Sequence, residues 1–191
     1  MGKLDDNPGD DIPIDCAERQ FTLSDAAFLA GVPEKSLYNW IERSVIVLSD
    51  KVWLPGAKTS RWMFSVYDTM KVSIVFDLAV RTRACELADA ASAAEVAVAA
   101  AIKADAAAHR DGIKPNVNVA LYWDRDGKLF CMIHDVKNAA AAYPPPPGKR
   151  SRYQPTRRVF SIIPATALLH DTINAALDLR DKLSKGASGD D

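Results

Sequence analysis

The sequence has almost no net charge and few cysteines. Its 191 residues include 24 basic and 25 acidic side chains, which gives a net charge of −1. That balance excludes a protein that holds nucleic acid by bulk charge alone, but it is compatible with a local basic face. The 3 cysteines, Cys16, Cys85 and Cys131, are odd in number and far apart in sequence. They predict neither a disulfide framework nor a metal site, and they favour a reducing compartment.

The sequence also lacks a long hydrophobic run without charges. The least polar stretch, residues 84–108, contains side chains that would be costly inside a bilayer: Glu86, Asp89, Glu95, Lys103 and Asp105. The N-terminus has no apolar segment of the kind that a secretory signal needs. We therefore expect no membrane partner and a cytoplasmic location, at the nucleoid if the chain binds DNA.

Glycine and proline are absent between residues 57 and 111. The later part of this stretch, residues 84–108, holds 14 alanines in 25 positions, and alanine has the highest helix propensity. This composition predicts a long helix over residues 84–112, ended by Gly112. Its expected contact face is a narrow stripe at helical spacing, formed by Leu87, Ala91, Ala94, Val98 and Ile102.

The two ends of the chain differ from the rest in composition. Residues 1–19 are rich in acidic side chains and contain Asn7-Pro8-Gly9, which predicts a disordered acidic leader. Residues 185–191 are mostly small and polar, which predicts a frayed tail.

Residues 113–184 predict a small domain with two strands, a loop, a third strand and a helix. Apolar residues alternate from Val117 to Trp123, Asp126-Gly127 is a turn signal, and a second apolar run follows over residues 128–133. This pattern predicts a β-hairpin. Residues 138–155 are proline-rich and predict an extended loop, whereas residues 157–163 predict a third strand. Pro164 is then expected to open the last helix.

Residues 21–46 predict two short helices joined by a tight turn. Apolar residues recur at helical spacing from Leu23, and Ser24 is the expected N-cap. Gly31 supplies the left-handed turn residue, and Pro33 can start the second helix. The buried side of that helix is expected to be Leu37, Trp40 and Ile41. This arrangement is a helix-turn-helix.

The second of these helices has polar and basic residues on its expected exposed side. Lys35 and Arg43 are suited to phosphate contacts, and Ser36, Tyr38 and Asn39 to hydrogen bonds with phosphates or base edges. A recognition helix needs such residues because its N-terminal end enters the major groove.

Short apolar runs around a glycine-containing loop, within residues 45–64, predict a small β-wing. Its basic residues, Lys51, Lys58 and Arg61, are expected to touch the DNA backbone. Ser65 is the expected N-cap of a following helix, with Asp68 completing a capping box.

Residues 20–83 resemble the winged helix-turn-helix of MerR-type transcriptional regulators. The matching positions run without a gap through Thr22-Leu23, Ala27, Gly31-Val32, Ser36-Leu37, Trp40, Val45-Ile46 and the closing Arg61, Phe64-Ser65 and Asp68. Thr22, which begins the pattern, is therefore added to the predicted DNA contacts. In this family a long helix after the wing pairs antiparallel with its partner, so the resemblance implies a homodimer formed through the alanine-rich helix.

The sequence departs from the family at three points. Tyr38-Asn39-Trp40 replaces the usual arginine and tyrosines, so base preference is not transferable. Ser44 replaces the usual glycine after the second helix. Nothing corresponds to the C-terminal cysteines of metal-sensing members, so we expect no metal and no other cofactor.

These patterns together predict an α/β chain whose function is sequence-specific binding of double-stranded DNA, as a transcriptional regulator. No catalytic constellation or phosphate-binding glycine loop is present, so we expect no enzyme. Two alternatives are a mobile-element accessory factor, excisionase-like or antitoxin-like, and a protein-interaction adaptor that retains the scaffold. A ligand-sensing role for residues 117–183 is a weaker hypothesis, and the sequence identifies no effector.

Overall fold

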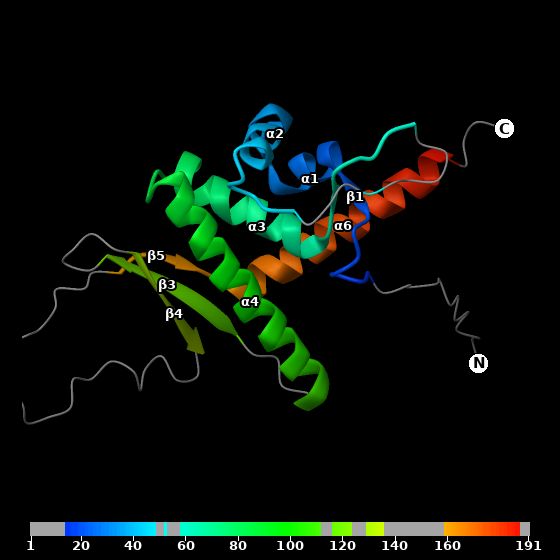
Figure 1. Ribbon diagram of the computed structural model, residues 1–191. Coiled ribbons are helices and arrows are strands. Elements are labelled where there is room, and N and C mark those ends of the chain that lie inside the picture. Colours follow the sequence, from blue (N-terminus) through cyan, green and yellow to red (C-terminus); the bar gives the residue numbers. More distant parts are fainter. Residues whose placement is uncertain are drawn as a thin grey trace, which may run out of the picture.

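The computed structural model describes residues 14–48, 52, 58–111, 116–123, 129–135 and 159–187. Several predictions lie outside these residues: most of the acidic leader, Lys51, the middle of the wing loop, the Asp126-Gly127 turn, the proline-rich loop and the last residues of the tail. The described chain combines helices with antiparallel strands (Figure 1). Its elements are β1 (Phe21–Thr22), α1 (Leu23–Ala30), α2 (Glu34–Glu42), β2 (Met63–Phe64), α3 (Val66–Phe76), η1 (Asp77–Arg81), α4 (Leu87–Asp111), β3 (Val117–Trp123), β4 (Leu129–Asp135), β5 (Val159–Ile163) and α6 (Ala165–Ala187).

The N-cap of the first helix lies two residues before the predicted one. The N-cap of α1 is Thr22, whose side chain accepts a hydrogen bond from the backbone N–H of Asp25, while the Asp25 carboxylate accepts from the N–H of Thr22. The prediction that Ser24 is the cap was therefore wrong. Thr22 is extended because β1 pairs with β2, so the chain is already positioned for a capping box at this residue.

Both helices of the N-terminal pair end in the same hydrogen-bonded turn. After α1, the N–H of Val32 donates to the carbonyl of Ala27, and Gly31 is left-handed with φ of 66°. After α2, the N–H of Val45 donates to Trp40 and that of Ser44 to Ile41, with Ser44 at φ of 55°. These are Schellman motifs. The left-handed Gly31 is confirmed, and the left-handed Ser44 occupies the position where the resembled family has glycine.

The strands around residues 45–64 are short. β1 pairs antiparallel with β2, with Phe21 opposite Phe64. A single antiparallel bridge joins Val52 to Arg61 through two backbone hydrogen bonds of 2.8 and 2.9 Å. Residues 45–48, 52 and 58–64 of the predicted wing are described, and this bridge joins its two sides.

The third helix, α3, lies at the centre of the fold. Ser65 and Asp68 form the predicted capping box at its start, so this prediction is confirmed. Met70, Val72 and Val75 are fully buried. The helix then widens into the π-helical turn η1, which ends at Arg81 with Thr82 as its C-cap. Arg83, the next residue, has a left-handed backbone with φ of 51°.

The long alanine-rich helix α4 spans Leu87–Asp111, close to the predicted 84–112. Its alanines are mostly buried inside the chain, because α4 packs against α3, α6 and the sheet of β3 and β4. Ala94 and Val98, two members of the predicted contact stripe, are buried in the single chain, Val98 with only 6% of its surface exposed. Ala94 and Val98 therefore serve intramolecular packing, since small side chains let helices approach closely, whereas Ile102 of the same stripe is 38% exposed.

The C-terminal sheet has the three predicted strands, in the order β4-β3-β5, all antiparallel. Val119 lies opposite Ile133 on one side and Ile163 on the other, and a bulge interrupts the second pairing between Leu121 and Tyr122. The last helix begins directly after Pro164, as expected, and crosses behind α3 and α4 (Figure 1). It continues to Ala187, so residues 185–187 are helical and the predicted tail was assigned three residues too early.

One continuous hydrophobic core joins the two ends of the described chain. It includes Phe21 from β1, Leu37 from α2, Val119 from β3 and Leu169 from α6. The position of the N-terminal helices is consequently determined by residues that lie more than a hundred positions away in the sequence. α1 itself contacts α6.

Candidate nucleic-acid interface

Four predicted contact residues lie together on the exposed side of α2. Lys35, Tyr38, Asn39 and Arg43 are exposed, and Ser36 is half-buried. The opposite side of the helix buries Leu37, Trp40 and Ile41, as predicted. Because the buried and polar residues separate cleanly, α2 presents a polar face to the solvent and is fixed by its apolar face.

The charge on this face is balanced. Glu34 and Glu42 are exposed on α2 beside Lys35 and Arg43. A phosphate would therefore meet no strong general attraction at α2, and any contact would depend on the placement of individual donors. Tyr38 and Asn39 supply neutral donors and acceptors between the charged residues.

The orientation of α2 is set by two contacts. The left-handed turn at Gly31 directs the chain from α1 into α2, and the ring of Trp40 lies 6.4 Å from that of Phe76, centroid to centroid. Phe76 is the last residue of α3. The polar face of α2 is therefore held at a fixed angle to the central helix.

The remaining predicted DNA contacts within the described residues lie outside α2, in the wing segment and at the start of α1. Lys58 and Arg61 are exposed, and the backbone of Arg61 is held by its bridge to Val52. Thr22 is half-buried, and its hydroxyl donates to the Asp25 carboxylate at 2.7 Å. The Thr22 side chain is thus engaged in capping α1.

Two further exposed cations lie at the end of η1 and just after it, and the sequence patterns did not single them out. Arg81 forms a partly exposed pair with Asp77 at 3.3 Å, and Arg83 is exposed at its left-handed position. In Figure 1, α2 stands between the segment of residues 58–62, in cyan, and the junction of η1 with α4, in green. The two arginines on either side of Thr82 are a basic pair that the sequence alone could have indicated as a DNA contact. The chain reversal that follows η1 could not be predicted from the composition.

The cysteine side chains are half-buried and protonated near neutral pH. Burial raises the pKa of Cys85, and the carboxylate of Asp89 and the neighbouring Cys131 raise it further. Burial and Asp89 likewise raise the pKa of Cys131, and burial with Asp105 raises that of Cys16. Thiols with raised pKa values are poor nucleophiles and poor metal ligands. Within the described ranges, no group of three or more histidine, cysteine or acidic residues is arranged to hold a metal ion.

None of the helices in the described part of the chain is long and apolar enough to cross a membrane. Comparison of the sequence with models of known families gives no match, and a search of curated proteins gives none either.

Proposed function

We propose that this chain is a transcriptional regulator that binds double-stranded DNA sequence-specifically through a winged helix-turn-helix. The observation that supports this most directly is the unit formed by α1, the left-handed Gly31 and α2, with a polar face on α2 and an apolar face against α3. In such a unit the second helix enters the major groove with its N-terminal residues foremost.

In this proposal the residues of α2 divide into two groups. Lys35 and Arg43 contact phosphates, and Ser36, Tyr38 and Asn39 reach phosphates or base edges. Lys58 and Arg61 contact the DNA backbone on one side of α2, and Arg81 and Arg83 contact it on the other side. The exposed positions of these four cations around α2 support the assignment.

The proposed regulator acts as a homodimer, and the stripe of α4 that faces solvent is suited to that role. Its members are spaced alternately by four and three residues, as in the seam of a helix pair: Ala88, Ser92, Glu95, Ala99, Ile102 and Ala106. In an antiparallel pair centred on Ala99, Glu95 of one copy, which also pairs with Lys71 of its own chain at 2.7 Å, faces Lys103 of the other. Both are exposed, and their charges are opposite.

A protein-interaction adaptor is the second candidate, and one observation favours it. Phe28 on α1 is 69% exposed and Val47, in the segment after α2, is 65% exposed, so this part of the chain also presents apolar side chains to solvent. An adaptor that has lost DNA contact would use these residues and would bind no duplex even at low salt. The mobile-element alternative differs in outcome, because an accessory factor would bend its site strongly.

The experiment that tests the proposal is selection of bound duplexes from a random pool by the full chain, followed by a footprint on the winning sequence. The expected result is one enriched motif and a footprint whose affinity falls steeply with salt, because phosphate contacts release counterions. Failure to enrich any motif, together with no gel shift at low salt, would favour the adaptor. Circular-permutation gels on the winning site would distinguish a bending factor from a simple regulator.

A further inference from the structure

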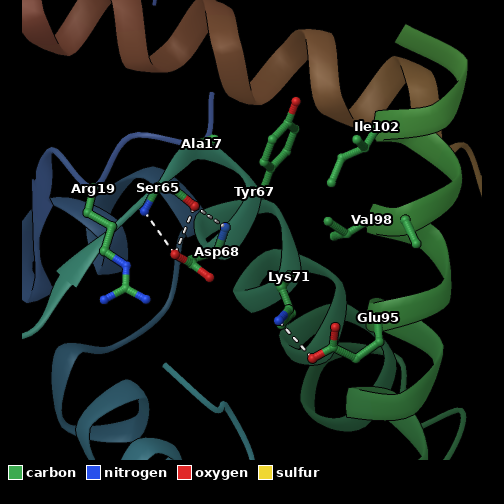
Figure 2. A pocket seen from close by; sticks show the side chains of 10 residues that line it. Ala17, Arg19, Ser65, Tyr67, Asp68, Lys71, Glu95, Val98 and Ile102 are labelled. Carbon is green, nitrogen blue, oxygen red and sulfur yellow. Dashed lines mark hydrogen bonds and ion pairs between the residues drawn. The ribbon is translucent and has the colours of Figure 1, made fainter. Parts of the chain in front are cut away.

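A hollow of about 350 Å³ lies between the chain that leads into β1, the first turns of α3 and the middle of α4 (Figure 2). None of the predicted DNA contacts within the described residues lines it. Its volume is at the lower end of the range that small-molecule sites occupy. The hollow is therefore large enough for a ligand of roughly ten non-hydrogen atoms.

The hollow is lined by hydrogen-bonding side chains of positive and of negative charge. The ammonium of Lys71, whose side chain is only 12% exposed, lies 2.7 Å from a carboxylate oxygen of Glu95, which is 60% exposed. A lysine ammonium has three donors, and this pair uses one of them. The guanidinium of Arg19 also lines the hollow. A ligand carboxylate would therefore find cationic donors here.

Carboxylate oxygens line the hollow as well. One oxygen of Asp68 accepts from the backbone N–H and the hydroxyl of Ser65, at 3.0 and 2.8 Å, and the other oxygen points away from Ser65 (Figure 2). Glu95 likewise has acceptor capacity beyond its pair with Lys71. A ligand ammonium would be able to donate to both residues.

The part of the hollow above Lys71 and Glu95 in this view is apolar (Figure 2). The ring of Tyr67 and the side chains of Val98 and Ile102 lie there, with the two α4 residues one turn apart (Figure 2). Val98 is buried against the core, so this wall is fixed, whereas Ile102 is 38% exposed at the rim. Burial of a branched aliphatic chain against this wall would be favourable.

We propose that this hollow binds a free apolar α-amino acid. The two cations and two carboxylates cancel, so a simple anion or a simple cation would meet a like charge as well as an opposite one. A zwitterion pairs with both: its carboxylate accepts from Lys71 and Arg19, and its ammonium donates to Asp68 and Glu95. Its apolar side chain lies against Val98 and Ile102. The binding uses none of the proposed DNA contacts, but Glu95, Ala99 and Ile102 also belong to the proposed dimer stripe, so the amino acid and a second copy compete for this part of α4.

The test is a titration of the full chain, labelled with ¹⁵N, with L-leucine. We expect saturable amide shifts confined to residues 65–71 and 95–102, with a Kd of about 1 mM or tighter for a ligand of this size. Three analogues dissect the recognition: 4-methylpentanoate lacks the ammonium, isoamylamine lacks the carboxylate, and glycine lacks the apolar chain. Each should bind at least about tenfold more weakly than leucine, since each loses a charged hydrogen bond or the apolar contact. No saturable shift at about 10 mM leucine, or equal affinity for 4-methylpentanoate, would overturn the proposal.

Two variants locate the site. Glu95→Gln should weaken leucine binding about tenfold or more because it removes a charge-assisted acceptor, whereas Glu86→Gln, at an exposed position outside the hollow, should leave the affinity unchanged. Ile102→Ala should weaken leucine binding by about threefold to tenfold through lost apolar contact. Wild-type affinity in both Glu95→Gln and Ile102→Ala would exclude this hollow as the site, whatever the DNA experiments show.

Discussion

The ring of Trp40 in α2 lies 6.4 Å from the ring of Phe76 at the end of α3, tilted by 44°. This contact joins the proposed recognition helix to the central helix of the core. Trp40 is buried, so its large side chain anchors α2 in the core. The polar face of α2 therefore depends on an aromatic pair that touches no ligand.

Trp40→Ala should destabilise the protein by about 3–5 kcal/mol, the usual cost of truncating a large buried aromatic side chain. Urea unfolding followed by circular dichroism measures the loss. DNA affinity should fall as well, because α2 is no longer held against α3. Trp40→Phe keeps an aromatic partner for Phe76 and should cost less; equal losses for both variants would argue against a role of the ring contact.

Lys35→Ala and Arg61→Ala should weaken binding to every duplex, and each should reduce the slope of log affinity against log salt by about 0.9. Both side chains are exposed, so the fold should be unaffected. Gel shifts across a salt series measure the slope. Lys182→Ala, which removes an exposed cation from α6, is the matched control and should leave the slope unchanged.

Asn39→Ala should alter the order of preference among duplexes, because an amide that reads a base edge contributes about 1–3 kcal/mol of discrimination. Repeating the duplex selection with the variant measures the change. If the variant selects the same motif with the same stringency, Asn39 makes no base contact, and the reading of sequence must be assigned to neighbours on α2.

Ser44→Gly should stabilise the protein by about 1 kcal/mol, because Ser44 has a left-handed backbone that is unfavourable for any residue with a Cβ atom. Ser92→Gly provides the opposite control. Ser92 lies in the second turn of α4, where glycine should destabilise the helix by about 0.5 kcal/mol, the difference between the helix propensities of serine and glycine. Denaturation midpoints compare the two; a loss of stability in Ser44→Gly would mean that its side chain contributes more than its backbone costs.

Ile102→Asp should convert the proposed dimer to a monomer without unfolding it, since Ile102 lies on the exposed stripe of α4. Light scattering measures the mass and circular dichroism the fold. Val98→Asp should instead unfold the chain, because Val98 is buried and an unpaired charge there is costly. A dimer that persists in Ile102→Asp would place the interface elsewhere.

The free energy of unfolding should fall as the pH rises above about 8.5, the ordinary pKa of a thiol. Burial and Asp89 raise the pKa values of Cys85 and Cys131, so the folded state favours the protonated thiols. This preference contributes its full stabilisation below the thiol pKa of the unfolded chain. The contribution is lost as the pH rises through the thiol pKa of the folded chain. Urea unfolding at neutral and alkaline pH, compared with the Cys85→Ala/Cys131→Ala double variant, isolates the effect, because the variant should lose less stability.

The sequence by itself determined the elements whose signals are local. The hairpin and third strand of the C-terminal sheet, the capping box of Ser65 with Asp68 and the turn at Gly31 all follow from side chains within a few residues of one another. The buried residues of α2 followed from the period of the helix, because one face of a short amphipathic helix must meet the core. The exposed set of Lys35, Tyr38, Asn39 and Arg43 followed from the same period.

Only the tertiary structure decided which surfaces remained exposed. The predicted stripe of α4 has the same composition whether it meets a second copy or α3 and α6 of its own chain, and the structure buries Ala94 and Val98 of it in the core. Thr22 rather than Ser24 caps α1 because pairing with β2, forty residues later, holds Thr22 extended. The reversal at Arg83 and the hollow beside Lys71 and Glu95 likewise arise where distant segments meet, and no local pattern of side chains specifies such a meeting.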